Sequence, residues 1–162
     1  MASLQEAMKK NPVFRTFTSA MLEPFLNSGE TRCYSEGAVL CNEGAEGREI
    51  YMVVEGKVNI LCSGAEPGKI LTHLMTLGPG DLIGEISFIE QEPRAATAVA
   101  STDVQAHVWP TASWKLMCEH HPAVGYQLMA GIARLLCQRI RKANLRVAIL
   151  NQIVGGGAEA SE

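Results

Sequence analysis

The sequence predicts an eight-stranded β-barrel of the jelly-roll type, flanked by helices. Between Arg32 and Pro110, short stretches rich in Val, Ile and Leu alternate with separators that contain glycine. Many short strands at turn-punctuated intervals are typical of antiparallel barrels and sandwiches. On both sides of that segment the apolar residues recur at helical spacing instead. Together these observations favour a double-stranded β-helix with N-terminal helices and a long C-terminal helix.

The stretch to about Asn27 is expected to form short helices, because its apolar residues recur three and four apart and Pro24 breaks up any long helix. The clearest strand stretches are 50–54, 58–61, 70–75 and 97–108. Glu55-Gly-Lys57 is predicted to be a hairpin turn, with the glycine at positive φ. Gly78-Pro-Gly-Asp81 suits a type II turn.

From Thr111 onward glycines become rare, and Pro122 suits the first turn of a helix that we expect to span 122–154. A chain of 162 residues with 47% hydrophobic residues is consistent with one domain and its own core. We therefore place a single domain at 1–154. The glycine-rich, polar residues 155–162 are expected to form a disordered tail.

The charge and cysteine content restrict the possible partners. A net charge of −3 does not favour DNA binding, and no apolar run approaches the roughly 20 residues of a membrane span. The polar N-terminus lacks a signal-peptide core, which predicts a cytoplasmic protein. Five widely spaced cysteines argue against a disulfide framework, and no Cys or His spacing indicates a metal site.

The segment 84–98, GEISFIEQEPRAATA, carries the chemistry. Gly84 lets the backbone approach a ligand, and a short helical turn over 86–89 would present unpaired N–H groups to an anion. Arg94 adds a planar, permanently charged group for phosphate. Glu85 beside a phosphate makes sense if it accepts from a sugar hydroxyl and also pairs with cations. A structural Glu85–Arg94 ion pair is the alternative, but it does not explain the turn between them.

This segment, with Gly37, Gly44, Gly56 and Leu77-Gly-Pro-Gly-Asp81 before it, resembles the cyclic-nucleotide-binding family, which includes protein kinase A regulatory subunits and the catabolite activator protein. The resemblance covers roughly 14–146. It implies that Glu85 binds the ribose 2′-hydroxyl and that Arg94 pairs with the cyclic phosphate. It also implies phosphate contacts from the backbone N–H groups of Ile86, Ser87 and Ala95. Ala95 rather than threonine after the arginine favours cyclic AMP, with cyclic GMP as the other possible ligand. Family members that have lost the ligand typically lack the arginine or the glutamate, whereas this chain has both.

The base pocket is defined less sharply. Ile60 and Met75 align with base-lining positions of the family, although inward positions of a barrel are also ordinary core. Alignment through His121-Pro122 places Arg139 and Ile140 opposite the base, where activator proteins have small hydroxylated residues. Arg139 is a candidate lid that stacks on adenine. A solvated or dimer-facing arginine is the alternative.

The last helix carries a heptad-like apolar stripe, which predicts a two-helix seam and a parallel homodimer. Its members are Met129, Ile132, Ala133, Leu136, Ile140, Ala143, Val147, Leu150 and Val154. We expect its first half to pack on the barrel and its second half to extend beyond it. The alternative is that the whole stripe packs on the barrel. The helix has no acidic residue, which suggests docking to an acidic partner.

These features predict a non-catalytic cyclic AMP sensor without a cofactor, acting in trans on an unknown effector protein. Residues 155–162 are too few for a helix-turn-helix, so we expect a stand-alone sensor without a DNA-binding domain. The alternative is a dimerisation or docking module of the same fold in which nucleotide is dispensable. A cupin-type enzyme on a similar barrel would need metal-ligand histidines, and no H-x-H pair is present.

Overall fold

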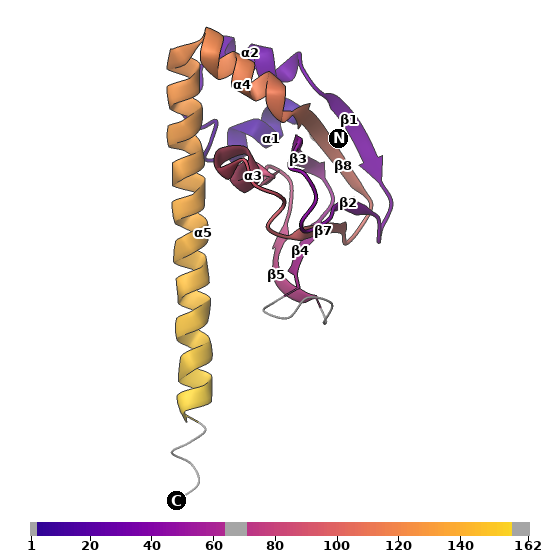
Figure 1. The fold of residues 1–162 in the computed structure, drawn as a ribbon, viewed down its shortest axis with the longest axis vertical. Helices are drawn as coiled ribbons and strands as arrows, with labels where there is room; N and C mark the ends of the chain where they lie inside the picture. Colours follow the sequence, from indigo (N-terminus) through magenta and orange to yellow (C-terminus); the bar gives the residue numbers. More distant parts are fainter. Residues whose placement is uncertain (1–2, 64–70, 157–162) are drawn as a thin grey trace, which may run out of the picture.

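The computed structural model describes residues 3–63 and 71–156. Within these ranges, eight strands form two four-stranded sheets, and helices flank them (Figure 1). The strands are β1 (Glu30–Tyr34), β2 (Val39–Cys41), β3 (Glu49–Glu55), β4 (Val58–Cys62), β5 (Thr72–Leu77), β6 (Leu82–Ile83), β7 (Thr97–Ala100) and β8 (Val104–Pro110). The helices are α1 (Leu4–Lys10), α2 (Ser19–Leu26), α3 (Glu85–Glu90), α4 (Thr111–His120) and α5 (Pro122–Gly156). The predicted jelly-roll class is confirmed.

The strand order is β1-β8-β3-β6 in one sheet and β2-β7-β4-β5 in the other, with antiparallel pairing throughout. Strands β3 and β4 therefore lie in different sheets, and the prediction of a hairpin at 55–57 is wrong. Gly56 does have a positive φ of 89°, as expected, but the turn carries the chain from one sheet to the other. A Cβ at Gly56 would overlap the carbonyl oxygen of Asp103, which also requires glycine there.

The predicted stretch 97–108 is two strands rather than one. The chain leaves one sheet after β7 and enters the other at β8, through a turn at 101–103. That turn is tied to the β3–β4 connection, because the Lys57 N–H donates to Thr102 Oγ1 at 3.0 Å and the Ser101 N–H donates to the Lys57 carbonyl at 2.8 Å. The type II turn is confirmed, with Gly80 at a φ of 96° and Asp81 N donating to Gly78 O at 2.9 Å.

An aromatic core fixes the helices to the barrel. Phe14, Phe25 and Trp114 pack edge to face, and the Trp109 indole N–H donates to the Phe25 carbonyl at 2.9 Å. The start of α5 joins this core through the buried residues Leu128, Ile132 and Leu135. The position of α5 against the cavity described below is therefore set by the same core that holds the N-terminal helices.

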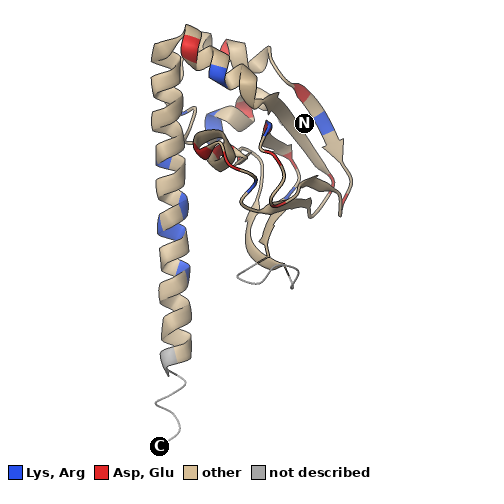
Figure 2. Ribbon diagram, in the orientation of Figure 1, with Lys and Arg blue, Asp and Glu red and all other residues tan. Residues whose placement is uncertain are grey.

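Helix α5 passes along the barrel and continues well beyond it (Figure 1). Residues 141–154 are all exposed, whereas the first half of the helix includes the buried residues Leu128, Ile132 and Leu135. Figure 2 shows basic residues along the middle of α5 and no acidic residue on it. The predicted disordered tail lies mostly outside the described residues, since α5 includes Gly156. No helix in the described ranges is both long and apolar enough to cross a membrane.

Candidate functional site

A cavity of about 490 Å³ lies between α3, the strands of the second sheet and the middle of α5. Nine of the ten predicted site residues line it, namely Ile60, Met75, Gly84, Glu85, Ile86, Arg94, Ala95, Arg139 and Ile140. The side chain of Ser87 does not, because it is buried beside Pro93 and borders a neighbouring hollow. The structure thus brings the predicted residues together around one space.

Gly84 begins this site in a conformation that few other residues adopt. Its φ is 97°, and it precedes α3, whose first-turn N–H groups have no partner within the helix. A Cβ at this position would overlap Nη1 of Arg94. Glycine at 84 therefore allows both the turn into α3 and the close approach of the guanidinium.

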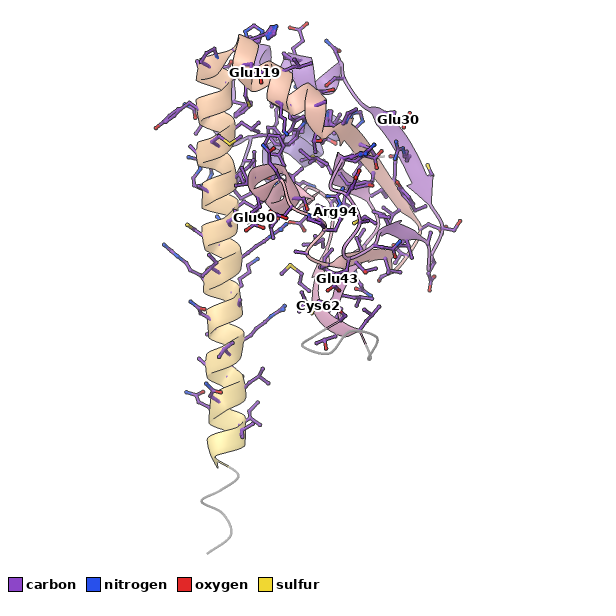
Figure 3. The ribbon with its side chains drawn as sticks, in the orientation of Figure 1. Glu30, Glu43, Cys62, Glu90, Arg94 and Glu119 are labelled. Carbon is purple, nitrogen blue, oxygen red and sulfur yellow. The ribbon has the colours of Figure 1, made fainter. Side chains whose placement is uncertain are left out.

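Arg94, which is labelled in Figure 3, is a buried cation with unused hydrogen-bond donors. Only 5% of the residue is exposed, and its Nη2 donates to the main-chain carbonyl of Glu49 at 2.5 Å. Its guanidinium carbon lies 5.6 Å from the centroid of the Tyr51 ring. Nε and Nη1 are buried and have no partner among the described residues. Because unpaired buried charge is costly, this arrangement favours an anionic ligand.

Glu85 is a buried anion that is only half satisfied. It is 1% exposed, and its Oε1 forms an ion pair with Nη1 of Arg139, whereas Oε2 has no hydrogen-bond partner in the described chain. Burial raises the pKa of Glu85 above its ordinary value, although the Arg139 and Arg94 charges act in the opposite direction. The ion pair of Glu85 is therefore with α5, and the structure shows no Glu85–Arg94 bridge.

Arg139 lines the cavity and is held there by two contacts. Its Nη2 donates to the Leu82 carbonyl at 2.7 Å, while Nη1 contacts Glu85, and its side chain is 18% exposed. The guanidinium is thus neither solvated nor free to stack on a base in this structure. The physical reason is that a buried Glu85 carboxylate draws the cation from the facing helix. Stacking of Arg139 on adenine stays a prediction for a nucleotide-bound form.

The rest of the cavity wall is apolar. Ile60 and Met75 are paired across β4 and β5, so both side chains enter the cavity from one place in the sheet. Further apolar positions come from β5, α3 and α5, namely Leu74, Ile86, Ile89, Leu136, Ile140 and Ala143. Val58, which precedes Ile60 on the same face of β4, is instead barrel core. This wall can hold a flat, apolar-faced group beside the two charged residues.

Sequence reasoning missed the two β3 residues that contact Arg94, Glu49 and Tyr51. Their side chains alternate onto one face of the strand, and Tyr51 Oη donates to Glu49 Oε2 at 2.6 Å. The pattern E-x-Y within an apolar strand was an available signal, because a carboxylate on an otherwise buried strand needs a partner. Among the described residues, no group of three or more side chains is placed to hold a metal ion.

Comparisons with known proteins agree with this geometry. Residues 31–121 match the family model described as "Cyclic nucleotide-binding domain". A protein named "Cyclic AMP receptor protein" from Thermus thermophilus is 29% identical over 144 residues, 89% of this chain and 64% of that protein. A cAMP-dependent protein kinase regulatory subunit from Eremothecium gossypii is 33% identical over 64% of this chain and 21% of its own length.

The chain thus spans less than two thirds of either relative. A solved N-terminal domain of a transcriptional regulator from Streptomyces coelicolor A3(2) superposes with a TM-score of 0.70 at 29% identity, covering 85% of this chain and 94% of that one. The family model spans more than half of the chain and includes the whole α3 segment with Arg94. The chain belongs to the cyclic nucleotide-binding domain family.

Proposed function

We propose that this chain is a cyclic AMP sensor that binds the nucleotide in the α3 cavity. The observation that carries the proposal is a pair of buried opposite charges facing one cavity, each with unused polar atoms. Arg94 Nε and Nη1 would receive the cyclic phosphate, and Glu85 Oε2 would accept from the ribose 2′-hydroxyl. First-turn N–H groups of α3 would add to the phosphate contacts, and the apolar wall would hold the base.

Cyclic AMP is proposed over cyclic GMP because of the residue that follows Arg94. Ala95 lines the cavity and supplies no side-chain hydroxyl to a guanine. The two relatives described above carry cyclic AMP in their names, which supports the same choice. We propose that the chain is a cytoplasmic binding module rather than an enzyme, and that it binds the nucleotide as a ligand and uses no cofactor.

Glu85 also offers a route from nucleotide to α5. Oε1 of Glu85 pairs with Arg139 of α5, while Oε2 has no partner among the residues that the structure describes. A ribose 2′-hydroxyl that donates a hydrogen bond to Oε2 would favour the ionised form of Glu85 and change its interaction with Arg139. The ligand thereby has different affinities for two positions of α5, which is the requirement for a ligand-dependent helix shift.

The output of the sensor would act in trans through the distal part of α5. Arg139 and Arg146 contact the cavity region, whereas Arg141 and Lys142 are exposed. Val147, Leu150 and Val154 continue the apolar stripe and are 55%, 59% and 76% exposed. We propose that these three residues form a homodimer seam and that an effector protein docks beside it. The same exposed stripe favours the second candidate, a dimerisation or docking module in which nucleotide is dispensable.

A titration separates the two candidates. Cyclic AMP is added to the purified chain in a calorimeter, with Arg94→Ala as the variant and 2′-deoxy cyclic AMP as the second ligand. We expect one site per chain, at least tenfold weaker binding by Arg94→Ala, and a preference for the 2′-hydroxyl that is lost in Glu85→Ala. Absence of binding at millimolar cyclic AMP would exclude the sensor and leave the docking module.

A further inference from the structure

The guanidinium of Arg94 is held by β3 from two directions. The Tyr51 ring lies beneath it, with 5.6 Å between the guanidinium carbon and the ring centroid, and the Glu49 carbonyl accepts from Nη2 at 2.5 Å. On another side, Gly84 leaves no room for any larger residue beside Nη1. Both β3 contacts come from positions i and i+2 of one strand, so their spacing is fixed by the sheet.

Tyr51 is itself anchored by a chain of hydrogen bonds that reaches the protein surface. Its hydroxyl donates to Glu49 Oε2 at 2.6 Å and lies 3.2 Å from the Leu40 carbonyl. The other Glu49 oxygen pairs with Nη2 of Arg32 on β1 at 2.8 Å. Tyr51 is 2% exposed and belongs to the barrel core, so packing as well as hydrogen bonding restricts its ring.

The protonation states keep this chain intact at neutral pH. Burial and the hydrogen bond to Glu49 raise the pKa of the Tyr51 hydroxyl above its ordinary value. Burial alone would raise the pKa of Glu49, but hydrogen bonds from Arg32 and Tyr51 outweigh it and lower that pKa overall. Tyr51 therefore remains a donor and Glu49 a charged acceptor. Arg32 is its salt-bridge partner, so the carboxylate orients Tyr51 without forming a direct ion pair with Arg94.

We propose that Tyr51, anchored by Glu49, is a positioning residue that holds the Arg94 guanidinium in place before the ligand arrives. This inference rests on the proposed nucleotide function, in which Nε and Nη1 of Arg94 receive the phosphate. One face of the Arg94 guanidinium lies over the Tyr51 ring, and its Nη2 donates to the Glu49 carbonyl. Nε and Nη1 are therefore the nitrogens that remain for a ligand. Preorganisation of this kind increases affinity because less freedom is lost on binding.

The test compares Tyr51→Leu, which removes the aromatic face, with Tyr51→Phe, which removes only the anchor. Each is made in the wild-type and Arg94→Ala backgrounds, with exposed Tyr126→Leu on α5 as the matched control. In the wild-type background we expect cyclic AMP affinity to fall roughly tenfold for Leu, as loss of a desolvated cation–π contact implies, and a few-fold for Phe. In the Arg94→Ala background Tyr51→Leu should change affinity less than twofold.

An equal loss in both backgrounds would overturn the proposal, because Tyr51 would then act on the barrel rather than on Arg94. An unchanged affinity for Tyr51→Leu in the wild-type background would overturn it as well. Should Tyr51→Leu fail to fold, the comparison passes to Tyr51→Phe and Glu49→Ala. These are expected to weaken binding equally and to give no further loss when combined, since both break the same anchor. Additive losses would refute the anchor.

A measurement without ligand keeps this inference separate from the proposed function. Because the guanidinium carbon of Arg94 lies 5.6 Å from the centroid of the Tyr51 ring, the ring current should shift the nuclear magnetic resonance signal of the Arg94 Nε–H proton. That shift should persist in Tyr51→Phe and disappear in Tyr51→Leu in the ligand-free protein. If the wild type shows the shift but binds no cyclic AMP, the proposed function fails while the positioning contact stands. If the shift is absent, the positioning role is refuted whatever the protein binds.

Discussion

Replacing Arg94 with methionine should separate ligand binding from folding. Methionine retains much of the side-chain length and apolar stem but removes the charge. Removing a buried arginine that belongs to an ion pair destabilises a protein by about 3–5 kcal/mol, because the partner carboxylate is left buried and unpaired. Among the described residues no carboxylate pairs with Arg94, and two of its donors are buried and unused. Removing each of these unsatisfied donors should stabilise the folded protein by about 1–3 kcal/mol.

The losses on the other side are of similar size. The hydrogen bond to the Glu49 carbonyl is worth about 1.5–3 kcal/mol and the contact with Tyr51 up to about 2 kcal/mol. The free energy of unfolding of the ligand-free Arg94→Met protein should therefore lie within about 1 kcal/mol of the wild-type value. With cyclic AMP at 100 times the wild-type Kd, the wild type gains about 2.7 kcal/mol, or roughly 5–11 °C in Tm, whereas a variant that binds at least tenfold more weakly gains no more than about 1.4 kcal/mol.

Thermal unfolding of both proteins, with and without cyclic AMP, measures all four states of this cycle. Circular dichroism confirms that the variant keeps its fold. A ligand-free variant destabilised by more than about 3 kcal/mol would show that Arg94 is a structural residue, contrary to our reasoning. A variant that gains as much stability from cyclic AMP as the wild type does would show that the phosphate lies elsewhere.

Three further predictions concern Glu85, Ala95 and the exposed end of α5. Burial raises the pKa of Glu85 in the folded protein above 4.5, so the contribution of Glu85 to ligand-free stability is fully present below that value and is lost as pH rises through the folded pKa. Glu85→Gln should therefore remove this fall of the unfolding free energy with pH, measured by unfolding titrations at several pH values. An unchanged pH dependence would contradict the prediction. Ala95→Thr should narrow the preference for cyclic AMP over cyclic GMP in competition binding, and a wild type that prefers cyclic GMP would show that the position was misread. Truncation after Arg146 removes Val147, Leu150 and Val154 and should shift the protein toward monomer in sedimentation, whereas a full-length chain that is monomeric at high micromolar concentration would refute the seam.

The fold was predictable because the glycines and the strand residues are local signals. Gly80 and Gly84 have the positive φ values that their turns require, and the α3 helix follows directly from the second of them. The error at 55–57 has a different origin. A glycine turn between two apolar stretches has the same sequence whether the strands pair with each other or belong to opposite sheets. Only long-range pairing, here of β3 with β8 and of β4 with β5, decides between the two.

The candidate site was predictable where one segment supplies it and not where distant elements meet. Glu85, Arg94 and Ala95 come from a single stretch whose spacing is informative by itself. The contact of Arg139 with Glu85 spans 54 positions, and that of Arg94 with Glu49 spans 45. Their existence depends on where α5 and β3 pack. A helix position that faces a cavity and one that faces solvent look alike in a sequence when both are occupied by arginine.

The placement of the two buried charges explains how one small ligand can report on α5. Arg94 and Glu85 have opposite charges and line the same cavity, yet each is held by a different element, Arg94 by β3 and Glu85 by α5 through Arg139. If they were paired with each other, a ligand would have to break that pair first. Because they are not, a molecule that carries a phosphate and an adjacent hydroxyl completes both at once. Its binding energy then comes partly from polar atoms that have no partner among the described residues, and one of these atoms belongs to the carboxylate that pairs with α5.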